Sequence, residues 1–237
     1  MRTRTRTTTA ATAVLSCLLA GDLTAGCGAG DAGETKSADE LLEDANATMR
    51  ALESVRIDST STAAKGGTVT SRLVTDLESR CSGRTAFSEG GSLEQIRMGE
   101  TDYVRPDRAY LEKWKPGGVT GEQRMWIKVP ADSAQPGDGL SSCTRPFTSF
   151  GEAKKGKSGP VAGRAAVELT VTDDGGDGGT GGTYTFHVAT EGEPHLLKVV
   201  YKGADYETTT SFTAFDEPLD IKAPDPAEVI DAEKATG

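Results

Sequence analysis

The sequence predicts an α+β fold in which one strongly curved antiparallel β-sheet, a half-barrel, holds an N-terminal helix on its concave side. One amphipathic helical pattern lies near the start of the chain, and about nine short segments of period-two alternation follow it. Hydrophobic residues make up only 35% of the 237 residues, so the core must be thin. Two or three helices can cover such a sheet only if the sheet curls around them.

The first 26 residues have the plan of an export signal. Three arginines within the first six residues precede an apolar stretch at 10–20. The run Leu23-Thr24-Ala25-Gly26-Cys27 then resembles the lipobox of bacterial lipoproteins, which implies cleavage before Cys27 and acylation of its thiol. Two alternatives are acylation at Cys17 and an ordinary secretory signal with an incidental cysteine.

These features predict a chain organised in three parts. Residues 1–26 form the signal peptide, 27–36 the lipidated cysteine with a short polar tether, and 37–237 a single domain. Nothing after Cys27 approaches the 18 consecutive apolar residues of a spanning helix. We therefore expect an extracytoplasmic protein anchored to the membrane through its acyl chains.

Two cysteines remain in the predicted domain, Cys81 and Cys143. An even number of cysteines in an exported protein predicts one disulfide. A redox-active pair is disfavoured because no Cys-x-x-Cys motif is present.

The domain begins with a helix. Ser37 and Glu40 fit a capping box, and apolar residues recur at helical spacing to about Leu52. A second short helix is expected near 140–150. The strands are expected around residues 55–59, 69–77, 93–98, 103–105, 125–129, 165–172, 184–189, 196–202 and 207–214.

One face of these strands is apolar, and a concave volume left unfilled by the helix would form an apolar pocket. The residues expected to line it are Leu73, Val167, Leu169, Val171, Tyr184, Phe186, Val188, Leu197, Val199 and Tyr201.

Several stretches resemble actinobacterial lipoproteins of the LolA/LppX/LprG-like family. They are the runs 188–198, 215–224 and 126–130, together with the cysteine pair. The resemblance implies a LolA-like half-barrel whose concave face, in some members, holds lipid acyl chains. The sequence departs from the family at 110–123, where Lys115-Pro116-Gly117-Gly118 interrupts a stretch that is often helical in relatives.

Three features suggest other chemistry, and each has a simpler interpretation. Residues 151–158 match the Walker A pattern, but Gly159-Pro160 prevents the helix that a phosphate site needs, which favours a solvated basic loop. The run Asp173–Gly179 lacks the spacing of a calcium loop and is expected to be a flexible hairpin loop. His187 and His195 lack a nucleophile or metal partner and are expected at the solvated surface.

The composition narrows the functional class. The net charge of −10 argues against nucleic acid as a partner, and we expect no cofactor, no metal and no enzymatic activity. The favoured hypothesis is a membrane-anchored protein that binds or carries a lipid-type ligand in the half-barrel cavity. The alternative is an interaction or structural module of the cell envelope with a filled core, whose protein partner the sequence does not identify.

Overall fold

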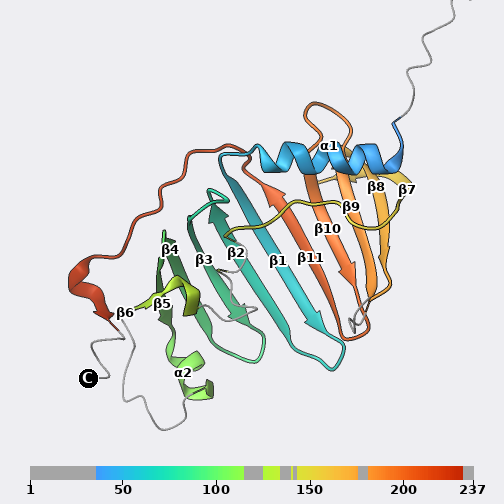
Figure 1. Cartoon of the computed structure of the whole chain (residues 1–237). Helices are drawn as coiled ribbons and strands as arrows, with labels where there is room; N and C mark the ends of the chain where they lie inside the picture. The colour runs from blue at the N-terminus through green and yellow to red at the C-terminus, as the bar shows by residue number, and fades with distance from the viewer. Residues whose placement is uncertain (1–35, 115–124, 134–139, 141–142, 176–180, 232–237) are drawn as a thin grey trace, which may run out of the picture. The chain divides into compact units, whose positions relative to one another are not determined.

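Twelve strands form one open sheet in the computed structural model, which describes residues 36–114, 125–133, 140, 143–175 and 181–231 (Figure 1). The strand order is β12-β6-β5-β4-β3-β2-β1-β11-β10-β9-β8-β7, with every neighbouring pair antiparallel except β12 and β6. The strands are β1 (Val55–Ala63), β2 (Thr68–Thr75), β3 (Arg80–Phe87), β4 (Ser92–Met98), β5 (Thr101–Pro106), β6 (Trp126–Pro130), β7 (Ala153–Val161), β8 (Arg164–Asp173), β9 (Gly182–Ala189), β10 (Leu196–Lys202), β11 (Tyr206–Thr213) and β12 (Val229–Asp231). The predicted α+β half-barrel is confirmed.

The predicted signal peptide, Cys27 and the tether up to residue 35 lie outside the described residues, so the three-part organisation stays a prediction. Among the residues that the structure describes, no helix has both the length and the apolar character needed to cross a membrane.

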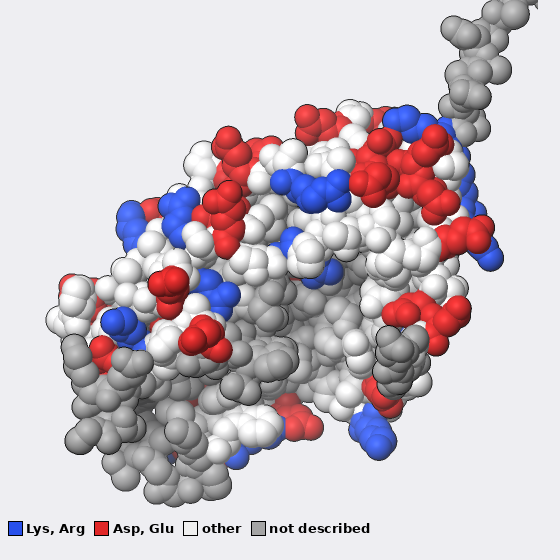
Figure 2. Space-filling model, in the orientation of Figure 1, with Lys and Arg blue, Asp and Glu red and all other residues white. Residues whose placement is uncertain are grey.

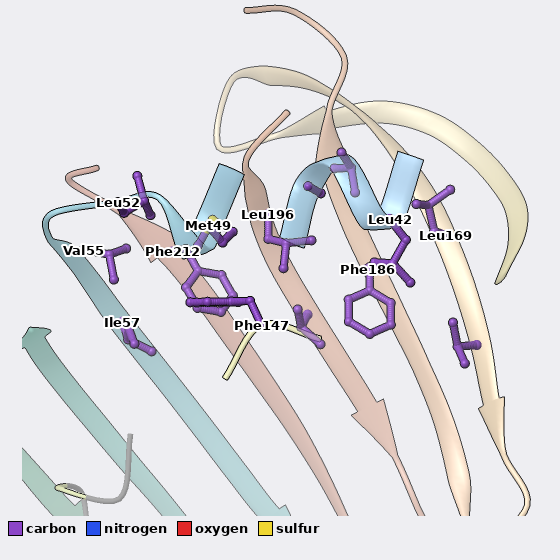
Figure 3. Packing of buried hydrophobic residues seen from close by; sticks show 14 of the residues in the cluster. Leu42, Met49, Leu52, Val55, Ile57, Phe147, Leu169, Phe186, Leu196 and Phe212 are labelled. Atoms are coloured by element: carbon purple, nitrogen blue, oxygen red, sulfur yellow. The ribbon is translucent and has the colours of Figure 1, made fainter. Parts of the chain in front are cut away.

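Helix α1 (Ala38–Arg50) lies across one end of the sheet on its concave side (Figure 1). Its capping box is formed as expected: the Ser37 hydroxyl accepts from the Glu40 amide at 3.2 Å, and the Glu40 carboxylate accepts from the Ser37 amide at 2.7 Å. The apolar side of the helix buries Leu42, Ala45 and Met49, which join strand residues such as Leu169 and Phe186 in the main hydrophobic cluster (Figure 3). This burial fixes the helix to the sheet.

The second helix lies elsewhere than expected. No α-helix forms in the described part of 140–150, where only Leu140 has a helical assignment, of the 3₁₀ kind; residues 145–150 have no regular secondary structure, and we call them the strap. Pro146 within it disfavours a helix at the preceding residue. In the described part of the chain the second α-helix is α2 (Arg108–Trp114), beside β4 and β5, and short 3₁₀ turns occur at Ala131–Ser133 and Pro226–Glu228. Residues 115–123 of the stretch compared with the family lie outside the described residues.

The basic segment that matches the Walker A pattern is a strand and not a loop. Residues 153–161 form β7, whose side chains are almost all exposed and which, among the described strands, pairs only with β8. A strand at a sheet edge can keep lysines on both faces in water, so the segment forms a strand without a buried face. No phosphate-binding helix follows it, because β8 begins at Arg164. Residues 176–180 of the predicted hairpin loop lie outside the described residues.

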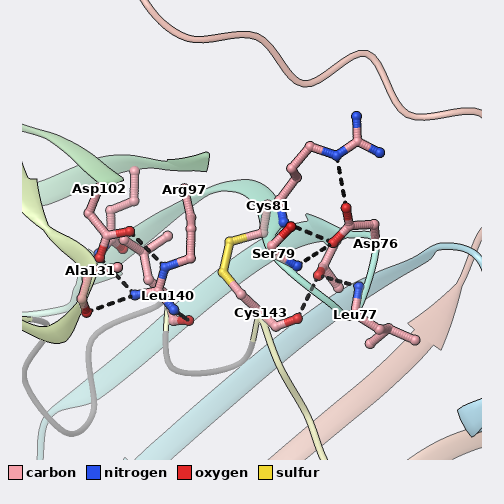
Figure 4. Close-up of a disulfide and its surroundings, with 12 residues drawn as sticks. Asp76, Leu77, Ser79, Cys81, Arg97, Asp102, Ala131, Leu140 and Cys143 are labelled. Carbon is pink, nitrogen blue, oxygen red and sulfur yellow. Dashed lines mark hydrogen bonds and ion pairs between the residues drawn. A yellow bond between two sulfur atoms is a disulfide. The ribbon is translucent and has the colours of Figure 1, made fainter. Parts of the chain in front are cut away.

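The structure contains the predicted disulfide between Cys81 and Cys143, with Cα atoms 5.6 Å apart (Figure 4). Cys81 lies in β3, and Cys143 lies two residues before the first residue of the strap. The Thr75 hydroxyl donates to the Cys143 carbonyl at 2.8 Å, which fixes the start of the strap against β2. The disulfide is therefore the point where the strap is joined to the sheet.

Candidate functional site

The concave face of the sheet is the candidate site. Figure 2 shows its hollow beside the rim that carries α1, and acidic side chains gather on the outer surface of the helix. We refer to the two ends of this face as the α1 end and the α2 end. At the α1 end the face is covered by α1 and by the strap, whose Phe147 is buried against Phe212 with ring centroids 5.8 Å apart.

Polar contacts hold the strap to α1. Arg50 donates to the Phe147 carbonyl at 2.6 Å and to Glu43 at 2.9 Å. Asn46 donates to the Ser149 hydroxyl at 3.0 Å, and that hydroxyl donates to Glu43 at 2.9 Å. The strap therefore has a fixed position over the sheet.

A small pocket of about 120 Å³ remains between α1, the strap and the sheet. Its wall is largely aromatic and aliphatic, with one charged side chain, Arg145. The lining residues are Asn46, Arg145, Pro146, Phe147, Thr148, Phe150, Tyr184, Phe186, Leu196, Val199 and Phe212. Burial raises the pKa of Tyr184 and lowers that of Arg145, so both groups sit in a medium less polar than water.

A larger apolar pocket of about 330 Å³ opens at the α2 end. Val69, Phe87, Trp114 and Tyr206 supply its apolar wall, and the turn between β1 and β2 closes one side. Trp114 and Tyr206 are 55% and 44% exposed, although large apolar side chains are usually buried. This pocket has the size and lining of a small-molecule site.

An aromatic row connects the two pockets. Phe150 packs edge-on against Tyr184 with centroids 4.8 Å apart, Tyr184 lies 4.7 Å from Tyr201, and Tyr201 lies 5.0 Å from Tyr206. Tyr184 lines the α1-end pocket and Tyr206 lines the α2-end pocket. The row therefore forms an apolar path across β9, β10 and β11.

The middle of the concave face is polar beside this row. Thr208 donates to Ser61 at 3.0 Å, and the hydroxyls of Ser59 and Thr210 lie 3.5 Å apart. These pairs come from β1 and β11, which are adjacent. An apolar ligand would therefore contact the aromatic row, with hydroxyl groups along one side.

The structure places the ten residues predicted to line a cavity in four different surroundings. Leu73, Val167, Leu169, Val171 and Val188 are at most 8% exposed and belong to the packed main cluster. Tyr184, Phe186 and Val199 line the α1-end pocket, and Tyr201 lies in the aromatic row.

Leu197 was assigned to the wrong face. It packs with Ala166 and Ala189 in a separate cluster, and Leu196 takes its place in the main one. The reason is a register shift in β10 between Leu196 and Lys198, which breaks the strict alternation used to assign the faces.

Both histidines were also misplaced, since each is only 7% exposed. His187 lies in β9, with its Nδ1 3.9 Å from a Glu168 carboxylate oxygen, and His195 stacks on Phe215. Burial is the first cause that lowers the pKa of each imidazole. No group of three or more His, Cys, Asp or Glu residues that could hold a metal occurs among the described residues.

The sequence reasoning did not identify the wall of the α2-end pocket or the contribution of the strap. Tyr206 could have been found, because it continues the alternation of β11. Trp114 and Arg145 could not, because each depends on a segment whose position is set by long-range contacts.

A half-barrel with an apolar, partly covered concave face is the arrangement expected for the LolA/LppX/LprG-like group. No protein-family model and no curated protein sequence matches the chain. Among solved structures, LprF from Mycobacterium bovis is similar, with a TM-score of 0.55 and 16% identity over 79% of this chain and 96% of that one. The lipoprotein LppX from Mycobacterium tuberculosis gives a TM-score of 0.51 and 11% identity over 77% and 98%.

At these identities the likeness concerns the fold alone. The predicted resemblance to the LolA/LppX/LprG-like lipoproteins is confirmed at that level.

Proposed function

We propose that this protein is an extracytoplasmic lipoprotein that is anchored to a membrane through Cys27 and binds an apolar ligand of the lipid class on its concave face. The α2-end pocket is the observation that carries the proposal. It presents Trp114 and Tyr206, both substantially exposed, around an apolar volume of about 330 Å³. The aromatic row extends this surface toward α1 and gives a long apolar ligand further contacts.

The other hollows of comparable size suit an apolar ligand less well. One, of about 470 Å³, is lined by Arg56, Arg72, Arg84 and Glu94, and another, of about 610 Å³, by several threonines with Lys202 and Glu207. Burying an apolar chain there would take these charged groups further out of water, which costs free energy.

A second candidate is an interaction module with a filled interior. The observation in its favour is the packing at the α1 end, where the strap leaves only about 120 Å³. The two candidates differ in whether the α2-end pocket takes up lipid.

A test of lipid uptake separates the two candidates. It uses the exported protein with Cys27→Ser, because this variant cannot be acylated at residue 27. We expect lipid to co-purify in organic extracts analysed by mass spectrometry, and a fluorescent fatty acid to bind. Trp114→Ala should weaken binding by up to about ten-fold, since an aromatic contact contributes about 0.5–1.5 kcal/mol.

The matched control is Ile230→Ala, because Ile230 is also exposed, at 41%, and does not line the pocket. Absence of both co-purified and added lipid would contradict the proposal and favour the interaction module.

The anchor has its own test. Metabolic labelling with a fatty acid in the producing bacterium should label the native protein and the Cys17→Ser variant. Cys27→Ser should remove the label. Label retained in Cys27→Ser, or lost in Cys17→Ser, would contradict anchoring at Cys27.

A further inference from the structure

Arg145 is a charged side chain without an opposite charge on the wall of the α1-end pocket. Its guanidinium lies 5.5 Å from the centre of the Phe212 ring, and the Arg145 side chain is half-buried. It makes no hydrogen bond or ion pair with any described residue. The pocket that it lines also contains Phe147, Phe150 and Tyr184.

Two other arginines, one buried and one exposed, are paired. Arg97, whose side chain is 12% exposed, donates twice to the buried Asp102 carboxylate at 2.7 Å. Arg50 donates to a carbonyl and to Glu43. Taking a guanidinium partly out of water costs free energy that an acidic partner normally offsets. The cation–π contact with Phe212 offsets only part of it.

We propose that Arg145 recognises an acidic group, a carboxylate or a phosphate, on the ligand of the concave face. The inference rests on the proposed function and narrows its ligand class to anionic amphiphiles. Guanidinium groups bind both kinds of acid through paired, charge-assisted hydrogen bonds.

The dimensions of the α1-end pocket fit this role. Its volume of about 120 Å³ corresponds to roughly four water molecules at their share of the liquid volume. An acidic group fits in that space, whereas an acyl chain does not. The chain would leave the pocket past Tyr184 and follow Tyr201 and Tyr206 toward the α2 end.

Two probes with the same chain test the proposal on the Cys27→Ser protein: oleic acid, ionised at pH 8, and oleyl alcohol. The wild-type pocket should bind the acid at least about ten-fold more tightly than the alcohol, as expected for a charge-assisted hydrogen bond. Arg145→Gln should abolish that preference while leaving affinity for the alcohol unchanged. Arg145→Lys should restore part of it, because the charge remains without the paired geometry.

The matched control is Arg56→Gln. Arg56 is exposed in β1, and its side chain also has no hydrogen bond or ion pair with a described residue, but it lines the charged hollow described above. This variant should keep the full preference for the acid. A melting temperature for Arg145→Gln at or above that of the parent verifies folding, since the substitution removes an unpaired charge.

The outcomes are distinguishable. Equal binding of the two probes, or a preserved preference for the acid in Arg145→Gln, overturns the role of Arg145 alone. Failure of both probes to bind contradicts the proposed function itself.

Inorganic phosphate, compared with chloride at the same ionic strength, distinguishes a lipid acid from a free anion. If phosphate raises the melting temperature as much as oleic acid does, the site belongs to a free anion and the lipid assignment is wrong.

Discussion

His195 packs its ring on Phe215, with centroids 4.1 Å apart, at the junction of β9 and β10. Its Nε2 is buried without a hydrogen bond, and the nearest Glu193 carboxylate oxygen lies 3.4 Å away. Burial lowers the pKa of the imidazole most, and the Arg164 guanidinium lowers it further, against the opposite effects of Glu193 and Asp216. The folded protein therefore favours the neutral ring.

This setting makes stability depend on pH. Because the folded-state pKa lies below the ordinary value of 6.5, the unfolded chain takes up the proton first as the pH falls. The contribution of His195 is therefore complete above about pH 6.5 and declines below it. We expect His195→Gln to reduce the loss of unfolding free energy between pH 7.5 and 5.5, measured by denaturant titration. An unchanged pH dependence in the variant would contradict a buried, neutral His195.

The strap acts as an element although it has no regular secondary structure. Phe147 is 4% exposed and fills space between α1 and Phe212, whereas Phe150 is 38% exposed and lies over Tyr184 and Phe186. The first ring belongs to the core and the second covers the aromatic row. The two phenylalanines therefore have separable effects.

Substituting each phenylalanine separately tests this division. Phe147→Ala should lower the unfolding free energy by about 3–5 kcal/mol, because it creates a cavity in a packed region. Phe150→Ala should cost about 1 kcal/mol, because its ring is partly exposed. Denaturant titration of the two variants measures the difference. Equal losses of stability would contradict this assignment.

The elements with a regular apolar period were predictable, and those without one were not. Leu42, Ala45 and Met49 identify the buried side of α1, and the alternation of residues 165–172 identifies the core face of β8. β3 escaped prediction because it contains Gly83 and arginines in place of an apolar alternation. The strap could not be predicted, because contacts distant in sequence, such as Arg50 to Phe147, determine its path.

The sheet as a whole is held together unevenly. α1 packs against the end formed by β7, β9 and β10, whereas the strands from β3 to β6 lie on the other side of β2. Besides the ladders that join β1, β2 and β3, the disulfide connects these two parts, since Cys81 belongs to β3 and Cys143 leads into the strap, which Asn46 and Arg50 bind to α1. The cross-link therefore joins β3 to the cover of the concave face.

Removing the disulfide should lower the stability of the whole folded protein. The two cysteines are 62 positions apart, and the chain-entropy account gives about 4 kcal/mol for a closed loop of that size. We expect reduction of the Cys27→Ser protein to lower the unfolding free energy by about that amount in denaturant titrations. The Cys81→Ser/Cys143→Ser variant should behave like the reduced protein and be insensitive to reductant.

The position of the cross-link predicts where the effect appears. Amide hydrogen exchange should increase first in the strap and in β3, while α1 and β8 to β10 keep their protection, because their packing does not involve the cysteines. Uniformly faster exchange would show that the disulfide stabilises the fold globally without a specific role in holding the strap. An unchanged unfolding free energy would show that the packing of the strap against α1 and Phe212 holds it without the cross-link.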